Sequence, residues 1–335
     1  MVPVAERSSS PNPLTRARDA VWHPTPGSLR LLALLGVLGN AMIVATGGAV
    51  RVTKSGLGCP EWPRCTGDSL VPTHSAEHPA LNMSIEFGNR MLTFVVLAVG
   101  FLVFVAALRL RPRRRALVGW AVAQPMSVVA QAVIGGIVVL TELHPASVAL
   151  HFLVSPALLV FCVILWVRAG EGDAPPRPLV GPRTRRLAAV LLVACGAVLV
   201  AGTVVTGTGP HAGDADSRRW GFNIEDVTRV HSALAWITVA LTVATAVVLH
   251  RTDAPPAARR RVHELIALEL AQGAVGYVQY FLGVPAPLVV LHMLGAVLMW
   301  IAAWRLALSL RDRGPLTRPA EPKPVTATKQ TPQPA

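Results

Sequence analysis

The sequence predicts an all-α integral membrane protein with eight transmembrane helices. Hydrophobic residues make up 52% of the 335 residues and charged residues only 15%, which is too apolar for an ordinary soluble domain. Segments of about 20 apolar residues recur along the chain, and about 20 residues cross the ~30 Å hydrocarbon core of a bilayer at 1.5 Å per residue. The eight segments are 29–50, 85–108, 116–140, 146–168, 187–206, 228–249, 263–282 and 286–308.

Arginines concentrate in alternate connections, after the second, fourth and sixth segments, whereas the connections after the third and seventh contain no Lys or Arg. By the positive-inside rule, the arginine-rich connections and both termini are cytoplasmic and the other connections face outward. The formal net charge of +13 therefore reflects topology and does not indicate a nucleic-acid partner. These arginines are Arg109, Arg111, Arg113, Arg114 and Arg115; Arg168, Arg177, Arg183, Arg185 and Arg186; and Arg251, Arg259, Arg260 and Arg261.

An internal repeat predicts two pseudo-repeated four-helix bundles of the same orientation. The third and fourth segments resemble the seventh and eighth at a shift of 141 residues, and a shift of 142 places Asn89 opposite His231. The same Gln-to-His spacing in both halves is the observation on which the repeat depends. The matched pairs are Gln131 with Gln272, Gly135 with Gly276, Leu150 with Leu291, His151 with His292, and Leu153 with Leu294.

The repeat divides the chain into five parts. They are a cytoplasmic N-terminal tail at 1–28, a first four-helix unit at 29–168, a cytoplasmic linker at 169–186, a second four-helix unit at 187–308, and a disordered cytoplasmic tail at 309–335. The first tail is polar and proline-rich and leads directly into a full-length apolar segment, so no cleavable signal peptide is expected. The second tail is rich in Pro, Thr and Lys.

Three histidines lie at a common depth in even-numbered segments. His151, His231 and His292 are each about four to seven residues from the outward end, or roughly 6–10 Å deep at helical rise. Ionisable side chains inside a membrane segment are costly and therefore indicate function by default. His231 and His292 fit the two axial positions of a b-type haem iron between facing helices. Two unrelated core histidines are the alternative, and a zinc site lacks further Cys or His ligands at suitable spacing.

The first unit keeps His151 but has Asn89 where the repeat places a second histidine. A site with one weaker ligand suits an occupant that is admitted, altered and released, whereas a bis-histidine site suits electron transfer. Glu86 and Arg90 share a helical face with Asn89, because residues three and four apart are neighbours on a helix. Glu86 is therefore a candidate proton carrier. The alternative is a carboxylate at a helix start that interacts with the macrodipole and with Arg90.

Two of the four cysteines, Cys59 and Cys65, lie in the outward sequence GLGCPEWPRCTG. On the oxidising side of a membrane they can form a disulfide, and a structural staple and a redox-active link to a partner or haem both remain open. Cys162 and Cys195 are expected to be packing residues. The remaining histidines are expected in surface or interfacial roles, with His144 and His211 the strongest exceptions; the others are His23, His74, His78, His250 and His263.

Five segments together resemble the haem A synthase family. They are GGAVRVTKSGLGCPEWPRC, IEFGNR, LHPASVALHFLVS, RVHS and LHMLG, and the resemblance covers about residues 30–308. It implies an oxidoreductase that converts the C8 methyl group of haem O to a formyl group, giving haem A for terminal oxidases. It also implies a multi-pass protein of the bacterial cell membrane with its haem sites toward the outer face.

The resemblance assigns roles residue by residue. Glu86 matches the family's essential acid, His151 a ligand of the substrate haem, and His231 and His292 the ligands of a haem b; Cys59 and Cys65 match a first-loop cysteine pair. The family commonly reads Glu, two residues, His, Arg where this chain has Asn89 before Arg90, which puts bis-histidine ligation of the substrate haem in doubt. The outward loop after the fifth segment also lacks the cysteine pair of some relatives.

Partners and rival functions follow from the same features. Candidate partners are the lipid bilayer, haem O, haem O synthase, cytochrome oxidase assembly factors, a membrane electron donor or acceptor such as quinone, and a second copy of the chain. The principal alternative is a non-catalytic transmembrane cytochrome b that passes electrons from quinol, but it predicts two equivalent bis-histidine sites. A transporter would favour broken segments or charges near the midplane.

Overall fold

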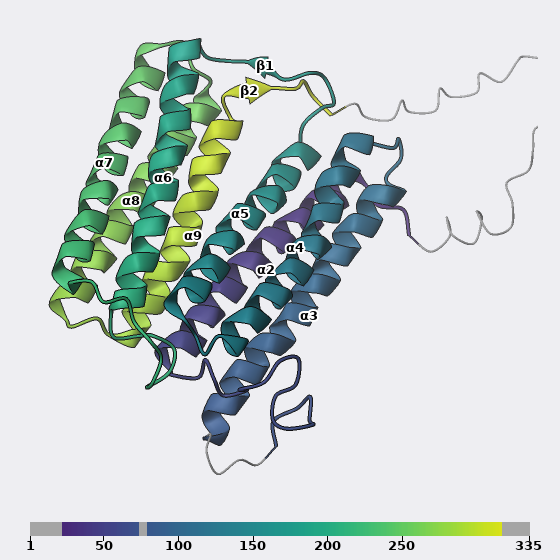
Figure 1. Ribbon diagram of the computed structural model, residues 1–335. Coiled ribbons are helices and arrows are strands. Elements are labelled where there is room, and N and C mark those ends of the chain that lie inside the picture. Colours follow the sequence, from purple (N-terminus) through teal and green to yellow (C-terminus); the bar gives the residue numbers. More distant parts are fainter. Residues whose placement is uncertain (1–21, 74–78, 317–335) are drawn as a thin grey trace, which may run out of the picture.

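The computed structural model describes residues 22–73 and 79–316, and in these ranges it contains eight long helices and one two-stranded antiparallel sheet (Figure 1). The helices are α2 (Pro26–Val52), α3 (Ala80–Arg109), α4 (Arg115–Leu140), α5 (Pro145–Ala169), α6 (Pro182–Thr208), α7 (Ile224–Arg251), α8 (Pro256–Phe281) and α9 (Ala286–Leu308). The strands are β1 (Arg177–Pro178) and β2 (Arg311–Asp312). The predicted tail segments 1–21 and 317–335 lie outside the described residues.

Several helices begin before the apolar segments that predicted them. Helix α2 starts after Thr25, whose side chain accepts a hydrogen bond from the Ser28 amide at 3.1 Å. Helix α7 starts after Asn223, whose Oδ1 accepts from the amides of Glu225 and Asp226 at 2.8 and 3.3 Å. These side chains partner the first amides of the helix, which have no partner within it. Apolar length alone therefore underestimates the helices, because their polar first turns are also helical.

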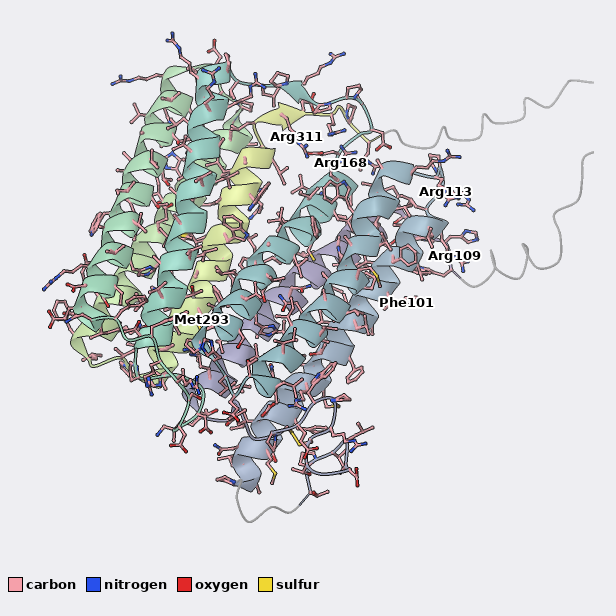
Figure 2. All side chains as sticks on the ribbon, in the orientation of Figure 1. Phe101, Arg109, Arg113, Arg168, Met293 and Arg311 are labelled. Carbon is pink, nitrogen blue, oxygen red and sulfur yellow. A yellow bond between two sulfur atoms is a disulfide. The ribbon has the colours of Figure 1, made fainter. Side chains whose placement is uncertain are left out.

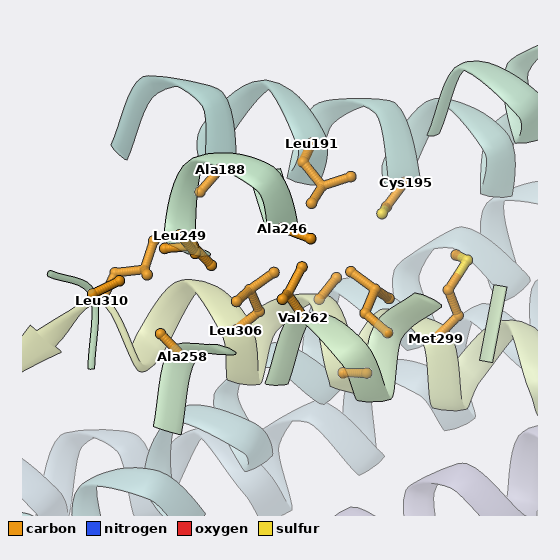
Figure 3. Close-up of a cluster of buried hydrophobic side chains, with 14 of the residues drawn as sticks. Ala188, Leu191, Cys195, Ala246, Leu249, Ala258, Val262, Met299, Leu306 and Leu310 are labelled. Atoms are coloured by element: carbon orange, nitrogen blue, oxygen red, sulfur yellow. The ribbon is translucent and has the colours of Figure 1, made fainter. Parts of the chain in front are cut away.

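The helices pack in two groups of four. Helices α2 to α5 pack against one another and form the first group, and α6 to α9 form the second (Figure 1). Each group has its own buried apolar cluster. In the first group the cluster includes Leu29, Leu117 and Leu165, and in the second it includes Leu191 and Leu306 (Figure 3). The division of the chain into two repeated four-helix units stays a prediction.

A third buried cluster joins the two groups through α2, α5 and α9. Its members are Val37 and Ala41 from α2, Leu159, Cys162 and Val163 from α5, and Val297, Ile301 and Leu308 from α9. Trp300 adds a hydrogen bond from its Nε1 to the Pro156 carbonyl at 2.9 Å, across the same interface. The groups thus share a packed seam, so the position of one helps to fix the position of the other.

Seven of the eight helices among the described residues are long and apolar enough to span a membrane. The exception is α8, for which the sequence predicted a span at 263–282. Its first half carries Arg259, Arg260 and Arg261 together with Glu264, and Glu269 follows farther along. The prediction is therefore confirmed for seven segments. The eighth forms the expected helix, packed between α7 and α9, but its composition is too polar to count as a span.

Arginine side chains gather at one end of the molecule, called here the arginine-rich end, where Figure 2 shows Arg109, Arg113, Arg168 and Arg311. The opposite end, called the cysteine-loop end, carries the connection that contains Cys59 and Cys65. Loops after α3, α5 and α7 lie at the first end and loops after α2, α4, α6 and α8 at the second. This separation agrees with the alternation of arginines in the sequence.

Part of the predicted disordered tail at 309–335 is ordered, which corrects that boundary. Arg311 and Asp312 form β2 and pair with Arg177 and Pro178 of β1 in the linker between the two groups. The Gly172 amide also donates to the Gly314 carbonyl at 2.9 Å. Backbone pairing with a distant segment leaves no mark in the composition of either segment, so the tail's polar composition could not predict this.

The linker is also held by Arg114, which lies just before α4 and is buried. Its guanidinium donates to Asp173 at 2.7 and 2.9 Å and to the carbonyls of Arg168 and Glu171 at 3.2 and 2.6 Å. The hydrogen bonds from Arg114 hold the pKa of the Asp173 carboxyl below its usual range. The connection between the two groups is therefore anchored to the first group.

Membrane orientation can be tested with a reporter enzyme that is active only outside the cytoplasm. Inserted after Asp216, in the loop between α6 and α7, it should be active; inserted after Asp253, between α7 and α8, it should be inactive. The reason is that the arginine-rich end stays on the cytoplasmic side. Activity at the second position and not the first would reverse the predicted orientation, and activity at both would mean that α7 does not span.

Candidate functional site

A cavity of about 1840 Å³ lies between the helices and is lined by residues from all eight of them. It is larger than the roughly 300–1,000 Å³ of a typical small-molecule site. The six residues predicted to form the helix-borne sites all contribute to its lining; they are Glu86, Asn89, Arg90, His151, His231 and His292. The structure thus brings the two predicted sites into one continuous space. What the individual residues do there stays a prediction.

His231 of α7 and His292 of α9 face each other in the second group, with ring centroids 6.3 Å apart and ring planes at 70°. An imidazole nitrogen coordinates a metal at about 2.0–2.1 Å, and each ring centre lies roughly 1 Å farther out, so two rings that share one metal have centres roughly 6 Å apart. The observed separation therefore fits two axial ligands on opposite sides of one haem iron.

Three glycines leave room for the three imidazoles. A Cβ atom at Gly135, Gly202 or Gly276 would lie 3.3 Å from the Cε1 atom of His151, His231 or His292, respectively. Contacts at this distance are tight, so a larger residue at any of these positions would push against the ring. The same glycine–histidine arrangement occurs once in the first group and twice in the second.

The Nδ1 atoms of His151 and His292 are buried and have no hydrogen-bond partner among the described residues. Burying a polar atom without a partner is unfavourable, so protein hydrogen bonds alone do not account for these ring orientations. The donor set, neutral imidazoles on helices around a largely apolar cavity, is one that suits haem iron. The residues present therefore fit a haem group.

Two glutamines support the histidine-bearing helices from the neighbouring helix. Gln131 Nε2 donates to the carbonyl of His151 at 3.4 Å and to Ser155 Oγ at 2.8 Å. Gln272 Nε2 donates to the carbonyl of His292 at 2.8 Å. The sequence spacing that predicted the repeat thus corresponds to one and the same interhelical contact in both groups, a role that the sequence did not reveal.

Glu86 is a buried carboxylate near the start of α3, and it accepts hydrogen bonds from Arg90 and from the backbone of the first outward loop. Its Oε2 accepts a hydrogen bond from the Cys59 amide at 2.7 Å. Its Oε1 accepts from Arg90, at 3.1 Å from Nε and 2.6 Å from Nη2. Glu86 therefore both lines the cavity and holds the first outward loop.

Arg90 fastens the same loop through its backbone carbonyls. It donates to the carbonyls of Cys59, Glu61 and Arg64 at 2.7, 3.1 and 2.9 Å. Cys59 and Cys65 form a disulfide inside this loop, and both side chains are fully buried. The loop also places Trp62 and Pro63 on the cavity lining. A charged pair on α3 thus shapes one wall of the cavity.

Asn89, which replaces the histidine expected from the repeat, accepts a hydrogen bond on Oδ1 from Thr46 Oγ1 at 2.8 Å. Its side chain is therefore tied to α2. The first group consequently has one imidazole, an amide and the Glu86–Arg90 pair on the cavity lining, whereas the second has two imidazoles. The asymmetry predicted from the sequence is present in the structure.

The two loop histidines singled out in the sequence differ in their positions. His211 lines the cavity and its Nε2 lies 2.8 Å from the Val284 carbonyl. His144 caps α5, because its Nδ1 accepts from the Ala146 amide at 3.3 Å, and it lies edge-on to Trp220. His74 and His78 lie outside the described residues.

Two residues of the cavity lining were not predicted from the sequence. Arg51 of α2 lines the cavity and donates to the carbonyls of Thr206 and His211, which ties the first group to the second. Glu269 of α8 is a buried carboxylate on the same lining. A carboxylate inside a predicted membrane segment would have indicated Glu269. Cys162 and Cys195 are free and buried, as expected of packing residues.

Comparison with known proteins decides the family. A profile of the COX15-CtaA family, described as a cytochrome oxidase assembly protein, matches residues 30–304. The chain belongs to this family. The match covers both groups of four helices, and so the resemblance found in the sequence is confirmed over nearly the same residues.

Curated relatives of this COX15-CtaA member include three that are named haem A synthase. The protein from one strain of Methylorubrum extorquens is 30% identical, over 85% of this chain and 87% of its own length. That from a second strain of the same species is 29% identical, over 88% and 91%. The protein from Halalkalibacterium halodurans is 31% identical, but the match covers only 45% of this chain and 49% of the relative.

Gly276→Ala and Gly273→Ala form a matched pair that tests the second-group site of this COX15-CtaA member. A new Cβ at Gly276 meets His292, whereas one at Gly273 meets nothing within 4 Å. Both changes favour the helix by roughly 0.5–1 kcal/mol. We expect Gly276→Ala alone to lower haem affinity, by about tenfold, as other changes around metal ligands do. Haem titration followed by absorbance measures this, and equal affinities in the two variants would contradict it.

Proposed function

We propose that this protein is a haem A synthase, which oxidises the C8 methyl group of haem O to a formyl group in its first group of helices and holds a haem b in its second. The observation that carries the proposal is the single cavity whose lining includes Glu86 and His151 at one site and the His231–His292 pair at the other. Membership of the COX15-CtaA family and the names of the relatives support it.

The second group holds the resident cofactor. His231 and His292 would ligate the iron of haem b through one ring nitrogen each, and Gln272 orients His292 by bonding its carbonyl. A haem b bound in this way supplies reversible one-electron transfer. Held by both histidines, the haem b would supply electron transfer and not methyl oxidation.

The first group holds the substrate. His151 would contact the iron of haem O from one side, and Asn89 occupies the position at which the repeat would place a second histidine. With at most one strong protein ligand, the substrate can bind and the product can leave. Release matters here, because haem A is made for terminal oxidases and must reach another protein.

Glu86 is the ionisable side chain suited to move protons at the first site. Oxidation of a methyl group to a formyl group adds one oxygen atom and removes hydrogen from the reacting carbon as electrons, which an oxidant must accept, and as protons, which must leave the site. A carboxylate on the cavity lining can accept or return such protons. Arg90 fixes the orientation of this carboxylate through two hydrogen bonds, which leaves Oε2 with the Cys59 amide as its partner.

The Cys59–Cys65 disulfide is proposed to be a structural staple. Both sulfur atoms belong to fully buried residues, and thiol–disulfide exchange requires access to a sulfur atom. The loop that it closes receives hydrogen bonds from Arg90 and gives one to Glu86. The staple would therefore help to hold Glu86 in place, and a role in transferring electrons is not needed.

Glu86→Gln tests the proton-carrying role, because glutamine keeps an oxygen for the Cys59 amide but cannot take up a proton in the same way. Cells that make haem O should accumulate haem A with the wild-type protein, and with the variant about 10²–10⁴-fold less of it. Acid extraction of the pigments followed by chromatography measures the yield.

Glu61→Gln is the matched control for Glu86→Gln, because within the described residues Glu61 takes part in the loop only through its backbone carbonyl. It should leave the haem A yield unchanged. Cys59 and Cys65 should stay inaccessible to a thiol reagent in both variants, which shows that the loop is intact. Haem A at the wild-type level in Glu86→Gln would refute the proton-carrying role.

His292→Ala tests the cofactor site, because it removes one of two proposed axial ligands. We expect the reduced spectrum of a bis-histidine haem b to disappear. His263→Ala is the matched control, since His263 lies edge-on to His250 near the arginine-rich end, with ring centroids 5.0 Å apart. An unchanged spectrum in His292→Ala would refute the ligand assignment. Protohaem as the sole pigment of the wild-type protein, with redox activity, would favour an electron-carrying cytochrome.

A further inference from the structure

Glu269 is a buried carboxylate to which the proposed function gives no role. It lies in α8, its residue is 5% exposed, and it contributes to the cavity lining. Burying a carboxylate in an apolar surrounding is costly unless it is paired or takes up a proton. Its presence accounts in part for why α8 is too polar to count as a span.

One oxygen of Glu269 has a partner and the other has none. Thr242 of α7 donates from Oγ1 to Glu269 Oε1 at 2.8 Å. Glu269 Oε2 is buried without a hydrogen-bond partner among the described residues. A buried carboxylate oxygen that accepts no hydrogen bond favours the protonated form of the group. Thr242 is itself fully buried, and its hydroxyl also lies 3.0 Å from the Thr238 carbonyl, so the two acceptors share one hydroxyl hydrogen.

Few titratable groups surround Glu269 on the helices that pack around it. Cys195 of helix α6 is close enough to interact electrostatically with Glu269, and Thr242 of α7 donates a hydrogen bond to it. On α9, Met299 lines the cavity, and Figure 3 shows it at the same end of the buried cluster as Cys195. Arg305 of α9 instead pairs with Glu264 at 3.6 Å, and Glu269 has no ion-pair partner among the described residues.

The distance from Glu269 to the proposed haem b site follows from α8. Gly276 lies beside the His292 ring: a Cβ atom added at Gly276 would be 3.3 Å from His292 Cε1. Glu269 precedes Gly276 by two helical turns, which is about 10 Å at 1.5 Å per residue. The carboxyl is thus too far from His292 to contact it but near enough to interact with a charge on the iron.

We propose that Glu269 is a proton-binding site coupled to the oxidation state of the haem b between His231 and His292. This inference rests on the proposed function of that site. Reduction of this haem b by an external reductant would raise the proton affinity of Glu269, so that a fraction of the Glu269 carboxylates would take up a proton from water through the cavity. The proton partly offsets the added negative charge, and it would be released again on oxidation.

The size of the coupling follows from the distance. A unit charge about 10 Å away, in surroundings with an effective dielectric constant of about 20, changes the proton affinity of a carboxyl group roughly tenfold. By linkage, proton binding changes the reduction equilibrium of the iron by the same factor. At low pH the carboxyl is neutral in both states, and at high pH it is charged in both, so the midpoint potential is higher on the acid side.

The test is a redox titration of the haem b in the purified full-length protein, with chemical mediators and dithionite, repeated across a range of pH. The wild-type potential should fall by about 59 mV in total as the pH rises, which is the one-electron equivalent of a tenfold change. In Glu269→Gln the fall should be absent, and the potential should stay near the acid-side value of the wild type, because a neutral amide resembles the protonated acid.

Three further variants sharpen the test. Glu264→Gln makes the same chemical change on the same helix, but Glu264 pairs with Arg261 at 2.6 Å near the arginine-rich end, so the fall should remain. Thr242→Val removes the hydroxyl that favours the charged carboxylate, so the fall should remain and move to higher pH. Glu269→Asp keeps a carboxyl group, so its midpoint potential should fall with pH, unlike that of Glu269→Gln.

The outcomes separate this inference from the function on which it rests. If the haem b spectrum is normal, equal falls of the midpoint potential in the wild type and Glu269→Gln, or no fall in the wild type, would overturn the inference and leave the proposed function standing. A Glu269→Gln protein without that spectrum would give Glu269 a structural role and would also overturn it. A wild-type protein with no haem at His231 and His292 would refute the proposed function together with the inference.

Discussion

The structure depends above all on the cost of placing polar side chains on helices whose outer faces contact hydrocarbon. Each helix must pair its own backbone N–H and C=O groups in hydrogen bonds, and any ionisable side chain must find partners or space inside the molecule. Glu86, Glu269 and the three helix-borne histidines obey this constraint in one way, since all of them line the same cavity. The cavity therefore does not have to be explained separately from the fold. It is where the polar residues of otherwise apolar helices can be accommodated together.

The seam between the two groups of helices turns this constraint into a defined geometry. Helices α2, α5 and α9 share a buried cluster, and Gly48 of α2 lies so close to α9 that a Cβ there would be 2.8 Å from the Met293 sulfur. Met293 follows His292 directly, so packing at the seam acts on the helix that carries this ligand. Arg51 adds hydrogen bonds from α2 to carbonyls of the second group. The proposed electron-transfer site and the proposed substrate site are thus held in a fixed relation by contacts that neither site supplies alone.

Much of this architecture could be predicted from the sequence because it depends on local composition. Apolar length located the helices, and regular spacing placed His151 and His292 against equivalent glutamines. Other features depend on how helices are rotated against one another, which composition does not record. The hydrogen bonds from Arg90 to loop carbonyls are of this kind, as is the pairing of β1 with β2. The polar residues of α8 were visible in the sequence. Glu269 was nevertheless overlooked, because the apolar residues around it are numerous enough for a membrane segment. The burial of Glu269 in the structure shows that it belongs to the interior.

The difference between the two groups follows from single residues within a shared plan. Both have a glutamine bonded to the carbonyl of a histidine, and both have a glycine beside the ring of that histidine. The second group adds His231, whereas the first has Asn89 held by Thr46, with Glu86 and Arg90 on the same face. Two strong ligands stabilise a bound iron in both oxidation states and disfavour exchange. Under the proposed function, one strong ligand together with the Glu86 carboxylate would permit exchange and proton movement, so the change of one side chain would separate a site that keeps its haem from one that alters and releases it.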